Sequence, residues 1–322
     1  MVFAREALAP GPGTRLEAIS QGGFMGSKAD FPQSVTIVEV GPRDGFQNIK
    51  KEIPTSDKVK IIDLLSASGL KRIEATSFTH PKWIPQLKDS GEVIRQIAKR
   101  PGVDISALIP NEKGLDRAVE TGVGEVVLVI SASDALNRSN FNKSTADSVA
   151  ELSPLGDKAK RTGIRLRGAV AAAFGCPIEG RVPQEKVVEV ARAFRRAGAF
   201  EVMLADTTGM AHPLQVQELF SRVTAELAGF PLALHFHDTL GIGLVNVFAA
   251  WQVGASIFES SIAGLGGCPY APGAPGNVAT ESLVYLFQQT GVQTGVDFDR
   301  IMECARITRE TLKTSGAEEC SR

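Results

Sequence analysis

The sequence predicts an α/β protein, a (β/α)8 TIM barrel with a short carboxyl-terminal helical extension. Short β-branched runs alternate with longer amphipathic segments over about 260 residues, and this alternation implies a parallel sheet. Eight repeating units fit a closed barrel better than a doubly wound sheet, which has fewer strands and often a glycine-rich nucleotide turn. The glycine cluster at 264–267 lacks the GxGxxG spacing of such a turn.

The predicted strands are short apolar runs rich in Val, Ile and Leu, at residues 35–40, 72–76, 104–108, 125–130, 165–171, 201–204, 232–236 and 256–262. Helices are predicted between them, for example at 56–68 and 183–197. We expect Thr55 or Ser56 to cap the first of these helices and Gly69 to end it.

One large domain is predicted at residues 33–322, since a chain of this length can bury a substantial core. Residues 1–32 are rich in Gly, Ala and Pro without sustained periodicity, so we expect a flexible leader outside the fold. Its apolar stretch is too short for a secretory signal.

The composition excludes several classes of partner. The formal charge is -1, with no basic, aromatic-interleaved cluster that would bind nucleic acid. No apolar run approaches the roughly 20 residues that span a bilayer, so no membrane partner is expected. Four cysteines without CxxC spacing indicate neither a zinc site nor a disulfide scaffold, and they favour a cytoplasmic protein: Cys176, Cys268, Cys304 and Cys320.

His235 lies in the predicted strand at 232–236, and His237 follows two residues later, just beyond the end of that strand. Alternate residues of a strand share a face, so both imidazoles could hold a metal, or one could hold a metal while the other moves protons. Alone, the pair could equally be two core or surface histidines that happen to alternate. Other strand ends must decide between these interpretations.

Polar residues gather where barrel strands end, and catalytic groups of this architecture lie at the carboxyl ends of strands. Asp44 follows the first strand and Asn277 follows the last. Each alone would be read as a turn residue, in Asp44-Gly45 and Gly276-Asn277. With His235 and His237 they form an oxygen and nitrogen set that suits Mg²⁺ or Mn²⁺.

Three further charged residues follow the same pattern. Arg43, unless it is a solvated surface residue, could stabilise a developing oxyanion with forked donors. Glu74 lies inside a strand, where a carboxylate is costly without a partner, so we expect it to pair with Arg43. Asp206 ends the sixth strand and could orient a ligand or cap the next helix.

Cys268 lies at 264–276, a glycine- and proline-rich stretch that reads as a mobile loop. A thiol on a closing loop could donate a proton to an enolate. Cys176 and Cys304 are expected to be small packing residues, and Cys320 to be accessible to oxidation.

Three motifs make the chain resemble the 3-hydroxy-3-methylglutaryl-CoA lyase family over residues 34–312: 38–48 (VEVGPRDGFQN), 235–239 (HFHDT) and 264–273 (GLGGCPYAPG). The resemblance implies a divalent-metal barrel that splits a 3-hydroxy-3-methylglutaryl thioester into acetyl-CoA and acetoacetate by retro-aldol cleavage. It also implies an acyl-CoA thioester as substrate and a homodimer.

The resemblance also implies roles for individual residues. Asp44, His235, His237 and Asn277 would form the metal shell, the first histidine also serving in proton transfer. Arg43 would stabilise the enolate, Cys268 would help to protonate it, and Glu74 and Asp206 would support the site. The implied substrate contacts are Arg43, Gln47, Ser77, Asn140, Ala169, Met203 and Thr207.

The departures from the family pattern concern the expected substrate pocket. Ala169 stands where a tyrosine is usual, Met203 where a serine is common, and Leu240 and Ile242 where tyrosine and glutamine are typical. Ile49 replaces an acidic residue near the first strand. A polar substrate group left unpaired among these side chains would be costly, so we expect a less polar pocket and a bulkier 3-hydroxy-acyl-CoA as an alternative substrate.

Two other functions compete with a lyase. A condensing transferase of the isopropylmalate or homocitrate synthase type shares the His-x-His pair, but the Cys268 loop and the short chain favour the lyase. A catalytically silent acyl-CoA-binding barrel is the other. The presence of Arg43, both strand histidines and Asn277 argues against it.

Overall fold

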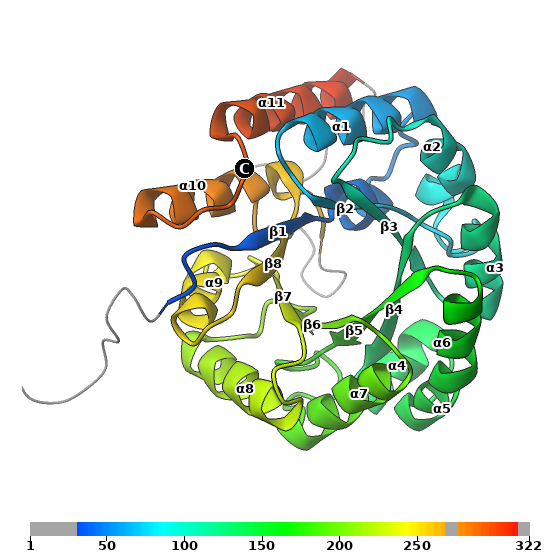
Figure 1. The fold of residues 1–322 in the computed structure, drawn as a ribbon, viewed down its shortest axis with the longest axis vertical. Coiled ribbons are helices and arrows are strands. Elements are labelled where there is room, and N and C mark those ends of the chain that lie inside the picture. Colours follow the sequence, from blue (N-terminus) through cyan, green and yellow to red (C-terminus); the bar gives the residue numbers. More distant parts are fainter. Residues whose placement is uncertain (1–30, 268–275, 315–322) are drawn as a thin grey trace, which may run out of the picture.

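The computed structural model describes residues 31–267 and 276–314. Eight parallel strands pair in sequence order and β8 pairs back with β1, which closes the barrel (Figure 1). The predicted fold class is therefore confirmed. The strands are β1 Thr36–Glu39, β2 Arg72–Ser77, β3 Asp104–Ile109, β4 Glu125–Ser131, β5 Arg165–Ala171, β6 Glu201–Asp206, β7 Leu232–Phe236 and β8 Ile257–Ser260.

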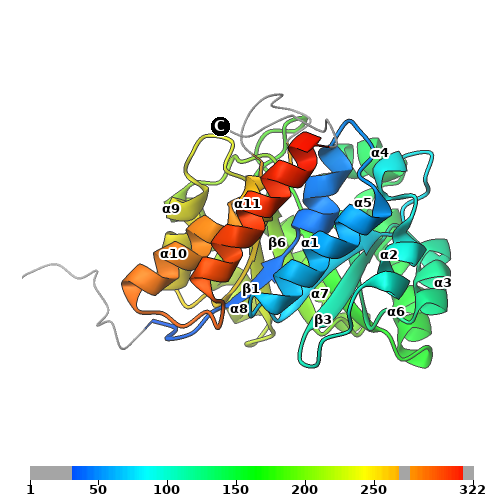
Figure 2. The same ribbon diagram turned by 90° about the horizontal axis from the view of Figure 1, so that it is seen from above.

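Helices surround the barrel (Figure 1). They are α1 Thr55–Ala67, α2 Ser90–Gln96, α3 Glu112–Thr121, α4 Asp134–Phe141, α5 Thr145–Ala150, α6 Leu152–Arg161, α7 Gln184–Arg196, α8 Pro213–Glu226, α9 Gly243–Gln252, α10 Thr280–Thr290 and α11 Phe298–Thr314. The predicted carboxyl-terminal extension is α11, which lies beside α1 and α10 on the outside of the barrel (Figure 2). None of the described helices is long and apolar enough to cross a membrane.

All eight predicted strands and both predicted helices are present, and their ends lie within two residues of the predicted ends. The expected hydroxyl cap of α1 is wrong. Pro54 occupies the cap position without a side-chain hydrogen bond, and the Thr55 hydroxyl instead donates to Asp89. Gly69 does follow the helix with a φ of +99°, a backbone conformation that L side chains rarely adopt.

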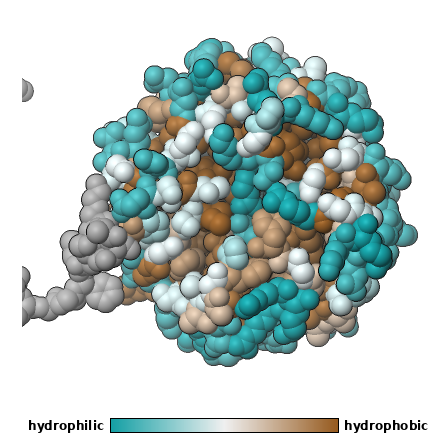
Figure 3. Space-filling view, in the orientation of Figure 1, coloured by the Kyte–Doolittle hydropathy of each residue, from teal (hydrophilic) through white to brown (hydrophobic). Residues whose placement is uncertain are grey.

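Two apolar layers hold the barrel together. The larger lies between the strands and the helices and includes Ile73, Val126 and Phe258. A smaller cluster lies apart from it, with Ala169 and Met203 among its members. Burial on both faces explains why the strands read as nearly continuous apolar runs. Outside the barrel, hydrophilic residues surround the rim of the face in Figure 3, with hydrophobic residues between them.

Charged side chains gather at the amino-terminal ends of β2, β4, β5 and β6. Arg72 pairs with Glu201 at 2.8 Å and with Glu125 at 3.4 Å. Arg165 pairs with Glu125 at 2.9 Å, and Arg167 pairs with Glu201 at 2.5 Å. We call this cluster the barrel floor, since it lies opposite the end at which the strands stop.

The chain already packs against the barrel at Phe31. Its ring lies 4.8 Å from that of Trp251, and the Trp251 indole donates to the carbonyl of Pro32 at 2.9 Å. The fold therefore includes the last part of the predicted leader, while residues 1–30 lie outside the described residues.

Candidate active site

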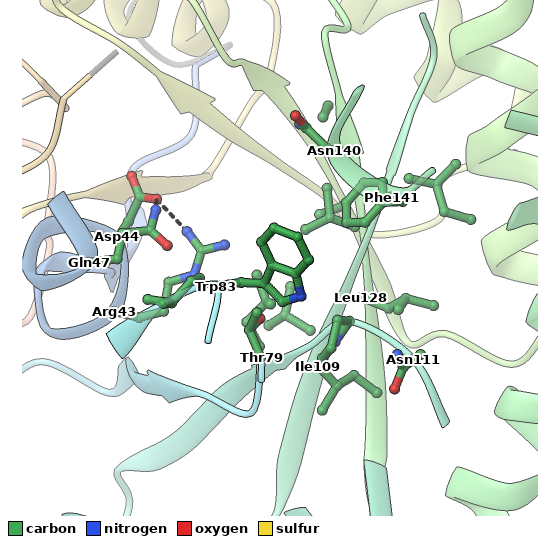
Figure 4. A pocket seen from close by; sticks show the side chains of 18 of the residues that line it. Arg43, Asp44, Gln47, Thr79, Trp83, Ile109, Asn111, Leu128, Asn140 and Phe141 are labelled. Carbon is green, nitrogen blue, oxygen red and sulfur yellow. Dashed lines mark hydrogen bonds and ion pairs between the residues drawn. The ribbon is translucent and has the colours of Figure 1, made fainter. Parts of the chain in front are cut away.

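Arg43 and Asp44 lie on a single helical turn, Gly41–Gly45, directly after β1. Their backbone amides both donate to the carbonyl of Val40, at 3.0 and 2.7 Å. Pro42 suits the start of the turn because its own missing N–H is not needed there. The turn places both side chains, together with Gln47, along one side of a cavity (Figure 4).

The two histidines of β7 face the same cavity. Their ring centroids are 5.1 Å apart, and the two residues are only 7% and 6% exposed. His237 pairs through its backbone with Asn277, which brings the end of β7 next to the segment before α10. The alternation of a strand thus aims both imidazoles inward, as predicted.

Asp44, His235 and His237 converge, with one ligand atom from each lying within 4.8 Å of the others. Asp44 is held by Gln47 and Asn277, each donating at 2.8 Å, and by an ion pair with Arg43. Burial alone would raise its pKa, but Arg43 and the histidines hold the pKa of Asp44 below its usual value. The carboxylate is therefore charged at neutral pH.

The donor atoms of this site fit a divalent cation. His237 Nδ1 and Asn277 Oδ1 are buried and have no hydrogen-bond partner among the described residues, and such orphaned atoms are costly without a ligand. Burial and the neighbouring His235 lower the pKa of His237 to about 4. Its imidazole is thus neutral at pH 7, which a metal ligand must be.

Gly266 lets Asn277 reach this position. Its φ is +131°, and a Cβ there would lie 2.6 Å from Asn277 Nδ2. Asn277 Nδ2 donates to the Leu265 carbonyl at 3.0 Å as well as to Asp44. With both donor hydrogens in use, the amide orientation leaves Oδ1 as the free acceptor.

Arg43 and Glu74 form the predicted ion pair, with Arg43 Nε 3.0 Å from Glu74 Oε1. The two groups are not aligned as a hydrogen bond, so the contact is mainly charge on charge. Burial raises the pKa of Glu74 to about 7 in spite of the arginine. The carboxyl group of Glu74 therefore titrates near neutral pH.

Asp206 ends β6 but does not line the cavity. One oxygen accepts from the backbone of Met210 at 2.8 Å, which is the capping alternative that the sequence left open. The other oxygen is buried without a partner among the described residues, and burial raises the pKa of Asp206 to about 6. Its support of the site stays a prediction.

A cavity of about 1300 Å³ opens beside the charged cluster. Figure 4 shows Trp83, Asn140 and Phe141 around it, across from Arg43 and Asp44. Five other predicted substrate contacts line it: Gln47, Asn140, Ala169, Met203 and Thr207. Ser77 does not, because its hydroxyl is buried and donates to Thr79 at 2.9 Å.

The cysteines divide as expected where the structure describes them. Cys176 and Cys304 are buried, which confirms that they are packing residues. Burial raises the pKa of the Cys304 thiol to about 11, so it stays protonated. Cys268 and Cys320 lie outside the described residues.

Sequence reasoning missed Glu259 on β8 and Arg167 on β5. The carboxylate of Glu259 lies 2.8 Å from His235 Nδ1 and forms an ion pair with Arg167. Although burial opposes it, Arg167 and His235 lower the pKa of Glu259 to about 2. The burial argument that singled out Glu74 would have found both residues, since each is a charge inside a predicted strand.

The profile of the HMGL-like family matches residues 34–308. The hydroxymethylglutaryl-CoA lyase YngG of Bacillus subtilis is 43% identical over 282 residues, which are 88% of this chain and 94% of that protein. The chain belongs to the hydroxymethylglutaryl-CoA lyase family. The matched residues contain every described member of the candidate site, so the family and the geometry concern the same part of the molecule.

Two other members add detail. A 3-hydroxy-3-isohexenylglutaryl-CoA/hydroxymethylglutaryl-CoA lyase of Pseudomonas aeruginosa is 43% identical, covering 89% of this chain and 96% of its own. An HMG-CoA lyase of Acinetobacter baumannii, solved with coenzyme A and 3-methylmalate, superposes with a TM-score of 0.84 at 39% identity, over 90% of this chain and 93% of its own. Membership of this family and the cluster of Asp44, His235 and His237 indicate a divalent metal site.

Proposed function

We propose that this protein cleaves 3-hydroxy-3-methylglutaryl-CoA to acetyl-CoA and acetoacetate and needs a divalent cation to do so. The observation that carries the proposal is the convergence of Asp44, His235 and His237 beside Arg43, at the carboxyl-terminal end of the barrel. Relatives named for this reaction match nearly the whole barrel.

Asp44, His235, His237 and Asn277 would hold the cation. Their oxygen and nitrogen donors, without a thiolate, favour Mg²⁺ or Mn²⁺. When bound, such an ion polarises substrate oxygens and makes loss of a hydroxyl proton feasible near neutral pH. His235 can serve in two ways, as a ligand or as the acceptor of that proton, and in both it must use the nitrogen that faces away from Glu259.

The cleavage breaks the C2–C3 bond of the substrate. The C3 hydroxyl loses its proton and becomes a ketone, while the electron pair of the broken bond moves onto the thioester enolate. The guanidinium of Arg43 lines the cavity and would donate to the enolate oxygen, held in place by Glu74 and Asp44. Cys268 would return a proton to C2, a role that we propose from the family motif alone.

The cavity suits an acyl-CoA thioester. Basic residues line it together with the apolar ones, and Lys113, Arg117 and Lys143 could face the phosphates of coenzyme A. Trp83 is 76% exposed at the cavity and offers a flat aromatic surface to the long cofactor (Figure 4). The related structure with coenzyme A bound supports this assignment.

The direct test is turnover of purified protein with hydroxymethylglutaryl-CoA, with Mg²⁺, with Mn²⁺ and with EDTA. We expect acetyl-CoA and acetoacetate in equal amounts with metal and none with EDTA. Binding of acyl-CoA without metal-dependent turnover would identify a silent binder. Consumption of acetyl-CoA with a 2-keto acid, and no cleavage, would identify a condensing transferase.

A second candidate is the same cleavage of a substrate with a larger hydrocarbon branch at C3. Strand register places Val129, Ala169, Met203 and Ala233 side by side across four strands, one layer below His235. All belong to the separate apolar cluster, and Met203 and Ala169 line the cavity. An apolar layer so close to His235 favours an alkyl branch at C3 over a charged one.

Filling that layer tests the second candidate. Ala169→Leu should reduce kcat/KM for a C3-isohexenyl substrate by 10- to 100-fold and change it little for the C3-methyl substrate, since a methylene in a pocket is worth about 1–3 kcal/mol. Ala193→Leu, on the buried face of α7, controls for packing damage because it lies in the main core and away from this layer. Equal losses with both substrates for Ala169→Leu would contradict a branch pocket.

We propose a homodimer in solution, as the family resemblance implies. Large apolar side chains are exposed on the described surface, including Leu214 and Leu240 at 74% each. Sedimentation equilibrium should give twice the chain mass of 34.2 kDa. A mass of one chain at micromolar concentration would refute the dimer.

A further inference from the structure

Glu259 on β8 lies directly beside His235 on β7. The parallel register pairs the two residues, and the His235 Nδ1 to Glu259 Oε2 distance is 2.8 Å. Both are buried, at 7% and 3% exposed. Water therefore does not compete for this hydrogen bond.

Arg167 fixes the other oxygen of Glu259. It reaches from β5 to β8 inside the barrel, is fully buried, and pairs with Glu259 Oε1. Its Nε is paired at 2.5 Å with Glu201, which in turn is held by Arg72 through two contacts of 2.8 and 3.0 Å. Glu259 is thus the end of a chain of buried ion pairs that begins at the barrel floor, and its carboxylate cannot rotate without breaking that chain.

A carboxylate only accepts hydrogen bonds, so the imidazole nitrogen that faces it must carry the hydrogen. A neutral imidazole has one N–H and one lone pair, so the second nitrogen is then bare. We propose that Glu259, anchored by Arg167, is the positioning residue of the site, and that it keeps the proton of His235 on Nδ1 and the lone pair of Nε2 toward the cavity. This inference rests on the proposed role of His235 as ligand or proton acceptor, since both need that lone pair.

His237 provides an internal comparison. Its Nδ1 has no hydrogen-bond partner among the described residues, so no protein group that the structure describes selects its tautomer. We expect the metal-free protein to hold His235 as a single Nδ1–H tautomer and His237 as a mixture. The tautomer of His235 is then fixed before a metal binds, whereas that of His237 can still change.

The first test needs no variant. Two-bond ¹H–¹⁵N correlation spectra of ¹⁵N-histidine-labelled, metal-free protein report which ring nitrogen carries the proton, at an alkaline pH where the imidazoles are neutral. His235→Asn and His237→Asn assign the two rings. A single Nδ1–H form for His235 is the expected result, and an Nε2–H form in the wild-type protein would overturn the proposal.

Glu259→Gln should invert the tautomer. Arg167 can only donate, so the amide oxygen of Gln would turn to Arg167 and its NH₂ group to His235. His235 Nδ1 would then have to accept, which moves the hydrogen to Nε2 and blocks the lone pair. We expect the Mn²⁺ affinity measured by calorimetry to fall by 10- to 100-fold, the usual effect of losing such a supporting group.

Glu125→Gln is the matched control. Glu125 is equally buried and paired with Arg72 and Arg165, but its partners among the described residues do not include His235. It should lower stability while leaving the His235 tautomer and the Mn²⁺ affinity within twofold of wild type. Equal losses of affinity in both variants would overturn a specific role for Glu259, and so would an unchanged tautomer in folded Glu259→Gln.

These measurements use metal-free protein and Mn²⁺ alone, without substrate. A protein that shows the expected tautomers but cleaves no acyl-CoA would contradict the proposed reaction and leave the positioning role of Glu259 standing. A protein that cleaves hydroxymethylglutaryl-CoA although His235 carries Nε2–H would do the reverse.

Discussion

The two ends of the barrel interior both carry buried charges, but the ends differ in how completely their polar atoms are paired. At the floor, Arg72, Glu125 and Glu201 form ion pairs between 2.8 and 3.4 Å. At the carboxyl-terminal end, His237 Nδ1 and Asn277 Oδ1 have no partner among the described residues. Paired charges stabilise the fold, whereas buried lone pairs without a partner are available to a ligand.

Glu259 joins the two ends. Arg167 is its partner on the floor side and His235 its partner on the site side. Burial alone therefore does not identify a functional charge, since both ends are buried. The two ends differ in their unpaired atoms: the site leaves acceptor atoms unpaired, whereas the one buried unpaired side-chain atom of the floor, among the described residues, is the donor Arg167 Nη2.

Removing a charge from the barrel floor should cause the largest loss of stability and little loss of catalytic activity. Glu201→Gln removes the charge that faces both Arg72 and Arg167. We expect the free energy of unfolding to fall by about 3–5 kcal/mol, because buried guanidinium groups lose their counter-charge. Urea denaturation measures this.

The control for the floor is an exposed pair of the same type, Lys88 with Glu52 at 2.9 Å. Glu52→Gln should cost less than about 1 kcal/mol, since water screens that pair. If Glu201→Gln unfolded no more easily than Glu52→Gln, the buried ion pairs of the barrel floor would contribute no more to stability than an exposed pair.

Arg43→Gln, at the carboxyl-terminal end, should reduce catalytic activity much more than stability, the opposite of Glu201→Gln. Arg43 is the cation closest to Asp44 and Glu74, and a lost oxyanion donor costs about 10²- to 10³-fold in kcat. Unfolding by urea should change less than in Glu201→Gln, since Glu74, whose pKa is about 7, can take up a proton when its cation is removed. Steady-state kinetics with saturating metal measure kcat, and Arg138→Gln, 61% exposed on α4, is the neutral control. An Arg43→Gln protein with full kcat would remove Arg43 from the mechanism.

The barrel could be predicted from the sequence because most strands are apolar on both faces and therefore contain continuous apolar runs, as in 126–130 and 232–234. The sequence was also sufficient for Asp44 and the histidines, which follow from strand alternation and from where active sites lie in this fold. The family motifs then gave specific roles that spacing alone does not give.

Cross-barrel contacts could not be predicted in the same way. Arg167 reaches Glu259 across 92 positions of sequence, and nothing local signals that contact. Ser77 ends β2, yet its hydroxyl donates to Thr79 and does not line the cavity. Which way a strand-end side chain turns depends on neighbours from other strands, and periodicity does not report them.

Glu39 is a buried charge that belongs neither to the floor nor to the candidate metal site. It is buried at the end of β1 and accepts from Gly41 and Ile262 backbone amides at 2.7 and 2.8 Å and from the Thr280 hydroxyl at 2.6 Å. Among the described residues it has no ion-pair partner. Both of its oxygens are hydrogen-bonded, but its charge is not compensated, and burial raises the pKa of Glu39 to about 7.

The pH dependence of stability follows from that pKa. In the unfolded chain the carboxyl titrates near 4.5, so between about 4.5 and 7 the folded state holds more protons than the unfolded state. Stability contributed by Glu39 is thus present at low pH and falls as the pH rises through this window, by roughly 3 kcal/mol in all. Glu39→Gln cannot titrate and should flatten this decline, leaving the parts due to Glu74 and Asp206, whose pKa values are also raised. Urea denaturation at pH 5, 6, 7 and 8 measures both slopes, and equal slopes in wild type and Glu39→Gln would mean that Glu39 is ionised throughout and stabilised by its three donors alone.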